Sequence, residues 1–155
     1  MKSLLLTSLF ATVLLSTAWA QNTQPVDITA AKLEVNQSAN TATFSGNVVV
    51  TQGNLTLNAP RVVAASAKAG GVQAITASGG VTITRPGTAG TNETATGTTA
   101  SYNPQAGTLT LTGAVTLTRG PSVLSGDKLV YNLQTGNAVV TNSQGPVKAR
   151  FVPGN

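Results

Sequence analysis

The chain has 155 residues, with nine Lys and Arg, four Asp and Glu, no His and no Cys. A chain without imidazole or thiol side chains has no His or Cys catalysis, no ordinary zinc site and no disulfide scaffold. We therefore predict a binding or structural protein that is not an enzyme and has no catalytic residues, metal site or cofactor.

The first 20 residues have the features of a cleavable secretory signal peptide. Lys2 gives a positive start, residues 4–15 are mostly apolar, and Ala18-Trp19-Ala20 matches a cleavage site. The apolar run is too short to span a bilayer comfortably, and no Cys follows it for lipid attachment. We expect one soluble domain over 21–155, outside the cytoplasm.

The composition of residues 21–155 favours strands. They include 22 Thr, 16 Val and 3 Ile, side chains that pack well on a pleated surface and lose freedom in helices. Apolar residues recur at every second position, for example in GTLTLTGAVTLTRG at 107–120. This alternation predicts strands with one buried face and one face of mostly Thr.

In chain order, a first strand is expected at about 27–35, followed by a repeated element. Its copies are FSGNVVVTQG at 44–53, ASGGVTITRPG at 77–87 and LTGAVTLTRG at 111–120. Segment 86–96 is the least apolar internal stretch and is predicted to be a mobile loop, and a last strand is expected at about 146–152. The glycines of these copies, at 46, 79 and 113, are 33 and 34 residues apart, and a repeat of this period favours stacked strand–turn units. We expect an all-β, open antiparallel β-roll or jellyroll.

One long run carries a family resemblance. ITAAKLEVNQSANTATFSGNVVVTQGNLTLNAPRVV (28–63), whose pattern returns at 107–136, resembles the LptA/OstA-like periplasmic lipopolysaccharide-transport family. The resemblance covers nearly all of 27–151. It implies a twisted β-jellyroll that carries acyl chains of lipopolysaccharide or a related envelope glycolipid. It also implies periplasmic location, LptC-like inner-membrane and LptD-like outer-membrane partners, and head-to-tail stacking.

The chain departs from that family at one element. An acidic residue usually precedes the basic one in its A-D-K/R pattern, and here only Asp127 keeps it, whereas Ala31, Pro60 and Thr98 replace it. This departure leaves the identity of the lipid open more than the fold.

The apolar strand faces are the candidate lipid channel, and ordinary core is the alternative. Only four aromatic residues follow residue 20, so a wide interior lined by Val, Leu and Ile need not close tightly. The two tyrosines are expected at strand ends with their hydroxyls in water. The predicted channel residues are Phe44, Val48, Val50, Leu55, Leu57, Ile75, Val81, Ile83, Leu109, Leu111, Val115 and Leu117.

Arg85 and Arg119 each follow a T-x-T pattern at the end of equivalent strands. We predict that they surround one mouth of the roll and contact lipid phosphates, for which Arg offers a bidentate fork. A solvated basic surface is the alternative. Nucleic acid does not fit, because the charges are dispersed without interleaved aromatic residues.

Two functions follow from these features. The first is a lipid-carrying bridge in which the first and last strands add to neighbouring copies by β-augmentation. The alternative is a structural or adhesive envelope β-repeat module that holds no lipid.

Overall fold

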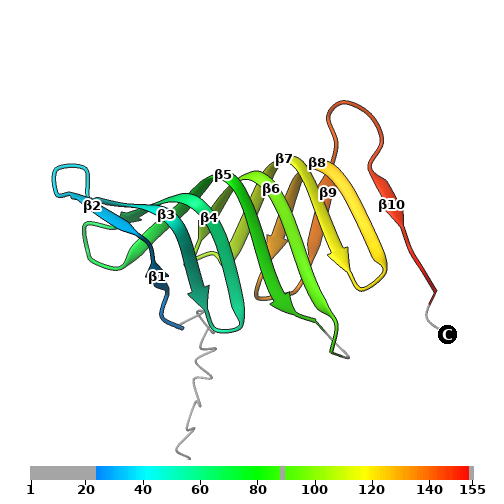
Figure 1. The fold of residues 1–155 in the computed structure, drawn as a ribbon, viewed down its shortest axis with the longest axis horizontal. Coiled ribbons are helices and arrows are strands. Elements are labelled where there is room, and N and C mark those ends of the chain that lie inside the picture. Colours follow the sequence, from blue (N-terminus) through cyan, green and yellow to red (C-terminus); the bar gives the residue numbers. More distant parts are fainter. Residues whose placement is uncertain (1–23, 88–89, 154–155) are drawn as a thin grey trace, which may run out of the picture.

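The computed structural model describes residues 24–87 and 90–153, so the predicted signal peptide lies outside the described residues. Within the described part, ten strands form one antiparallel sheet, and no helix there is long and apolar enough to cross a membrane (Figure 1). The strands are β1 (Asp27–Thr29), β2 (Lys32–Asn36), β3 (Thr41–Gln52), β4 (Leu55–Ser66), β5 (Val72–Pro86), β6 (Asn92–Asn103), β7 (Thr108–Arg119), β8 (Ser122–Asn132), β9 (Ala138–Thr141) and β10 (Lys148–Arg150).

Strands β3 to β8 follow one another as hairpins, each paired with the next. At one end β1 and β2 pair with successive parts of β3, and at the other end β9 and β10 pair with successive parts of β8. None of the described strands joins the two ends, which lie on opposite sides of the molecule (Figure 1). The fold is therefore the open antiparallel β-jellyroll that the sequence predicts.

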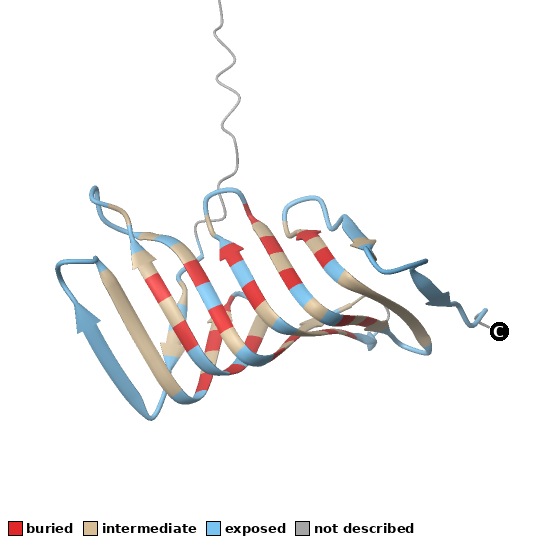
Figure 2. Cartoon of the chain, turned by 90° about the horizontal axis from the view of Figure 1, so that it is seen from above, coloured by how far each residue is buried: buried red, intermediate tan, exposed pale blue. Residues whose placement is uncertain are grey.

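Each long strand is divided by a bulge, so the sheet bends into two half-sheets that face each other (Figure 2). Side chains on the inner parity of both halves form the core. The outer parity is mostly Thr and Ser, and it stays partly exposed. Half A contains residues 41–45, 61–66, 72–78, 99–103, 108–112 and 128–132, and half B contains 48–52, 55–58, 81–86, 92–96, 115–119 and 122–126.

The repeated glycines lie at these bends. Gly46 and Gly79 have φ of +81° and +91°, a conformation that side chains with a Cβ rarely adopt. Space is also short: a Cβ on Gly46 would lie 2.8 Å from the Cβ of Ala31, and one on Gly79 would lie 3.1 Å from Cγ of Pro60. Ala31 and Pro60, two positions at which the chain departs from the A-D-K/R pattern, thus pack against the bends of β3 and β5.

Three sequence predictions about elements need correction. Segment 86–96 is not all loop, because β5 continues to Pro86 and β6 begins at Asn92. Its low apolar content reflects a strand whose outer face is Thr and whose inner face carries Glu93 and Ala95. The first strand is broken into β1 and β2. The last predicted strand is shorter, at Lys148–Arg150, because the terminal segment pairs with β8 in two separate pieces, β9 and β10.

Candidate functional site

The twelve predicted channel residues all lie on the inner parity of the half-sheets. Ten of them are buried core residues, and Phe44 and Leu55 are partly buried and pack against that core. They come from β3, β4 and β5, which are neighbours in the sheet, and from β7, which β6 separates from β5. The structure therefore gathers the predicted set into one continuous apolar interior.

Opposite the bends, the free ends of the two half-sheets approach each other along a line that we call the seam. Tyr102, at the half-A end of β6, reaches across it and donates a hydrogen bond from its hydroxyl to Oε1 of Gln52, at the half-B end of β3. Gln52 in turn donates from Nε2 to the backbone oxygen of Gln24 at 2.9 Å. Tyr102 and Gln52 are both buried, so the prediction of a hydroxyl in water is wrong here.

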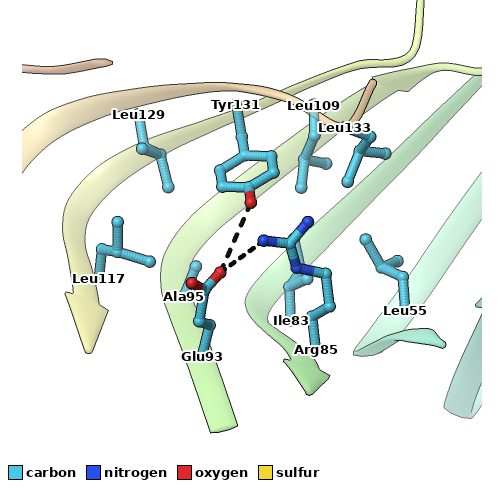
Figure 3. Close-up of a pocket in the computed structure, with 10 residues that line it drawn as sticks. All are labelled: Leu55, Ile83, Arg85, Glu93, Ala95, Leu109, Leu117, Leu129, Tyr131 and Leu133. Carbon is cyan, nitrogen blue, oxygen red and sulfur yellow. Dashed lines mark hydrogen bonds and ion pairs between the residues drawn. The ribbon is translucent and has the colours of Figure 1, made fainter. Parts of the chain in front are cut away.

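A second bridge crosses the seam further along the roll (Figure 3). Tyr131 of β8, in half A, donates from its hydroxyl to Oε2 of Glu93 on β6, in half B, at 3.5 Å. The Arg85 guanidinium lies 4.8 Å from the centre of the Tyr131 ring, a cation–π contact that contributes about 0.5–1 kcal/mol at a partly exposed site. Tyr131 too is buried, so its hydroxyl is not in bulk water.

Glu93 is the centre of this bridge. Its Oε2 accepts from Nη2 of Arg85 at 2.8 Å, and its Oε1 pairs with Nη2 of Arg119. The side chain of Glu93 is 8% exposed, against 24% for Arg85 and 55% for Arg119. Burial without partners would be costly for a carboxylate, so the two guanidinia are what allow Glu93 to lie inside.

Sheet register explains why these three charges meet. Arg85 pairs with Glu93 across β5 and β6, and Glu93 pairs with Arg119 across β6 and β7. Opposite charges directly across a ladder attract, and a lone carboxylate between two guanidinia leaves a net charge of +1. The structure thus brings the two Arg side chains together, but at the seam and not at an open end of the roll, and they already hold an internal anion.

Sequence reasoning missed Glu93, and a signal for it was present. Arg85 and Glu93 are equally far from residue 89, the centre of the connection between their strands, so a hairpin with a symmetric register would pair them. Treating 86–96 as a loop concealed that pairing.

Within the described residues, two small cavities in the interior are each lined by the residues of one bridge. The larger has a volume of about 30 Å³ and is lined in part by Arg85, Glu93 and Tyr131 (Figure 3). The smaller, of about 10 Å³, is lined in part by Gln52 and Tyr102. Each is on the scale of a single water, whereas ligand pockets occupy roughly 300 Å³ or more. The interior is thus apolar but tightly packed, and it has room for an acyl chain only if the half-sheets separate.

The polar groups at the seam are well satisfied. No buried side-chain nitrogen or oxygen in the described residues lacks a hydrogen-bond partner. Burial raises the pKa of the Tyr131 phenol above its ordinary value, and the nearby Arg85 charge partly opposes that rise. The phenol therefore stays protonated and acts as a donor to Glu93.

Among the described residues, no group of three or more His, Cys, Asp or Glu could hold a metal ion.

The two ends of the sheet expose apolar side chains. Leu33 and Val35 of β2 pair with Phe44 and Ala42 on the inner parity, and they are 55% and 67% exposed. Beyond β10, Phe151 is 71% exposed. The apolar inner surface thus continues to the first edge of the roll without being covered there.

Comparison with known proteins agrees with this architecture. A family model described as LptA/(LptD N-terminal domain) LPS transport protein matches residues 27–137. A crystal structure of LptH from Pseudomonas aeruginosa, described as the LptA homologous periplasmic component of the lipopolysaccharide transport device, superposes with a TM-score of 0.75. That match has 22% identity and covers 86% of this chain and 99% of the other. No curated protein matched in a sequence search.

Proposed function

Because this chain belongs to the LptA/(LptD N-terminal domain) LPS transport protein family, we propose that it is a periplasmic bridge protein that carries lipopolysaccharide or a related glycolipid between the membranes. Acyl chains lie between the half-sheets, and the phosphorylated sugars remain in solvent at the seam. No residue makes or breaks a bond. The observation that carries the proposal is the continuous apolar interior formed by the inner parity of the strands.

Burial of acyl chains supplies the binding energy. Each methylene removed from water contributes about 0.8 kcal/mol. The free energy of separating the half-sheets opposes binding, because the packed interior must open before an acyl chain can lie inside it. Arg85 and Arg119 at the seam are proposed to contact the phosphates of the cargo.

A charge inside the interior tests the proposal. Val115 is 1% exposed on the inner parity of β7, and its neighbour Thr116 is on the outer parity. Val115→Asp places a carboxylate where acyl chains would lie, whereas Thr116→Asp places the same charge towards solvent. We expect only Val115→Asp to lose lipopolysaccharide binding, measured by fluorescence on protein shown to be folded by circular dichroism.

A folded Val115→Asp variant with unchanged lipid affinity would contradict the assignment of these residues to a lipid channel. Mass spectrometry of lipid that co-purifies with the protein gives an independent test. Its absence, together with no binding of added lipid, would favour the structural or adhesive envelope module.

The same proposal extends to assembly. The first edge, β1 and β2, and the last, β9 and β10, lie at opposite ends of the sheet (Figure 1). Both edges expose apolar side chains, such as Leu33 on β2 and Val139 on β9. We propose that the last strand of one copy adds to the first strand of the next, and that the end copies meet LptC-like and LptD-like partners. Because such head-to-tail contacts do not close into a ring, they give assemblies with a variable number of copies.

Truncation after Gln144 tests the assembly. It removes β10, whose pairing with β8 spans only three residues. We expect a folded monomer that binds lipid but no longer shows oligomers that grow with concentration in light scattering. If the intact chain remains monomeric at high concentration, both alone and when its membrane partners are added, the bridge proposal is wrong.

A further inference from the structure

The seam is bridged at two points, and the residues of each bridge line one interior cavity. Tyr131 and Glu93 line the larger cavity, and Tyr102 and Gln52 line the smaller one. Leu55, Leu109 and Leu133 line both, so the two cavities adjoin one another. Any acyl chain that occupies this space from the seam has to separate at least one of these bridges.

The two bridges differ in chemistry. The Tyr102–Gln52 bridge is neutral, and Gln52 is also held by the backbone of Gln24. The Tyr131–Glu93 bridge contains a buried carboxylate that both guanidinia hold. Guanidinium groups that bind a carboxylate present the same donors to a phosphate. A phosphate that reaches Arg85 and Arg119 therefore competes with Glu93 for the same N–H groups.

We infer that Glu93 is an internal stand-in for the anionic group of the cargo, and that it keeps the seam closed until that group displaces it. The inference rests on the proposed function and adds how the anionic group of the cargo opens the seam, by taking the place of Glu93 at the two guanidinia. In the closed form Glu93 holds Arg85 against the Tyr131 ring and accepts from the Tyr131 hydroxyl.

Displacement of Glu93 has two consequences. Arg85 and Arg119 turn to the new anion, and the cross-seam contacts of Tyr131 with Arg85 and Glu93 are lost together, because both depend on the present position of the carboxylate. The net charge of +1 at the three residues is then balanced by a phosphate monoanion. A neutral amphiphile with the same acyl chains has no group to exchange for Glu93, so the seam opens less readily for it.

The experiment compares two glycolipids with the same sugars and acyl chains: lipid A, and lipid A from which the phosphates have been removed. Affinities are measured for the wild-type chain, Glu93→Gln, and the matched control Glu34→Gln. Glu34 also forms an ion pair, with Lys32 at 2.9 Å, but both side chains are more than half exposed on β2. The two substitutions therefore change net charge equally, and only one touches the seam.

We expect Glu93→Gln to bind lipid A about fivefold more tightly, because the internal competitor is gone. Its affinity for the dephosphorylated lipid should change by less than about twofold, and Glu34→Gln should change neither, as for an exposed ion pair. An equal change for both lipids, no change for either, or an equal effect of Glu34→Gln overturns the inference. A wild-type chain that binds neither lipid instead contradicts the proposed function.

A second variant keeps the test valid if Glu93→Gln does not fold, which could follow because that substitution leaves two guanidinia without their anion. Glu93→Asp keeps the charge and shortens the side chain by one methylene, which weakens its reach to Tyr131 and to both guanidinia. We expect it to bind lipid A more tightly than the wild-type chain and less tightly than Glu93→Gln. If Glu93→Gln does not fold and Glu93→Asp binds both lipids as the wild type does, the inference is wrong.

Discussion

The substitution Leu109→Ala would test where acyl chains enter the interior. Leu109 is 4% exposed and lines both cavities, so removing its side chain beyond Cβ joins spaces of about 30 and 10 Å³ into one. A buried Leu→Ala change costs about 3 kcal/mol of unfolding free energy. With a urea dependence of about 2 kcal/mol per molar, the unfolding midpoint falls by about 1.5 M.

The matched control is Leu111→Ala, two residues along the same inner face. Leu111 is fully buried but packs at the bend near Gly97 and lines neither cavity. Both variants should lose similar stability, which urea unfolding followed by circular dichroism measures. Only Leu109→Ala should bind an acyl probe more tightly, by about threefold or 0.65 kcal/mol, because fewer core atoms must move aside.

Equal acyl affinity in Leu109→Ala and Leu111→Ala would refute this reasoning. The cavities beneath the seam would then be packing defects of an ordinary core, and acyl chains, if bound, would lie elsewhere. Loss of affinity in Leu109→Ala alone would also refute it, because that outcome makes Leu109 a contact and not an obstacle.

Two further predictions concern the bends and the seam. Gly113→Ala should destabilise the fold by about 1–3 kcal/mol in thermal unfolding, because Gly113 has φ of +82° and an added Cβ would press on Thr98. The control Gly136→Ala should cost less, because Gly136 has a similar φ of +74° but no atom lies within 4 Å of an added Cβ. The raised pKa of Tyr131 predicts that stability falls as pH rises past 10.0, since the unfolded phenol releases its proton before the folded one does. This alkaline loss, measured as urea midpoints at increasing pH, should be smaller in Tyr131→Phe, and equal losses in both chains would contradict it.

The sequence alone was enough to predict the all-β class, the inner faces of the long strands and the open roll, although it misplaced 86–96 as a loop and the bounds of the two edge strands. Alternation of side chains is a local property, because a strand sends successive side chains to opposite faces whatever lies beyond it. Residues such as Leu109, Leu111, Val115 and Leu117 could therefore be assigned to one face before any pairing was known. The spacing of Gly46, Gly79 and Gly113 likewise indicated a repeat, although their place at the bends became clear only from the structure.

Only the tertiary structure decided how the roll closes. The seam joins Tyr102 to Gln52 and Tyr131 to Glu93, residues that are 50 and 38 positions apart in the chain. Their meeting depends on the bend of every strand between them and on the twist that offsets one half-sheet against the other. Because no local pattern encodes that offset, the sequence indicated an apolar interior, and only the folded chain shows the seam bridged by Tyr102 and by Tyr131, whose hydroxyl meets a buried carboxylate held between two arginines.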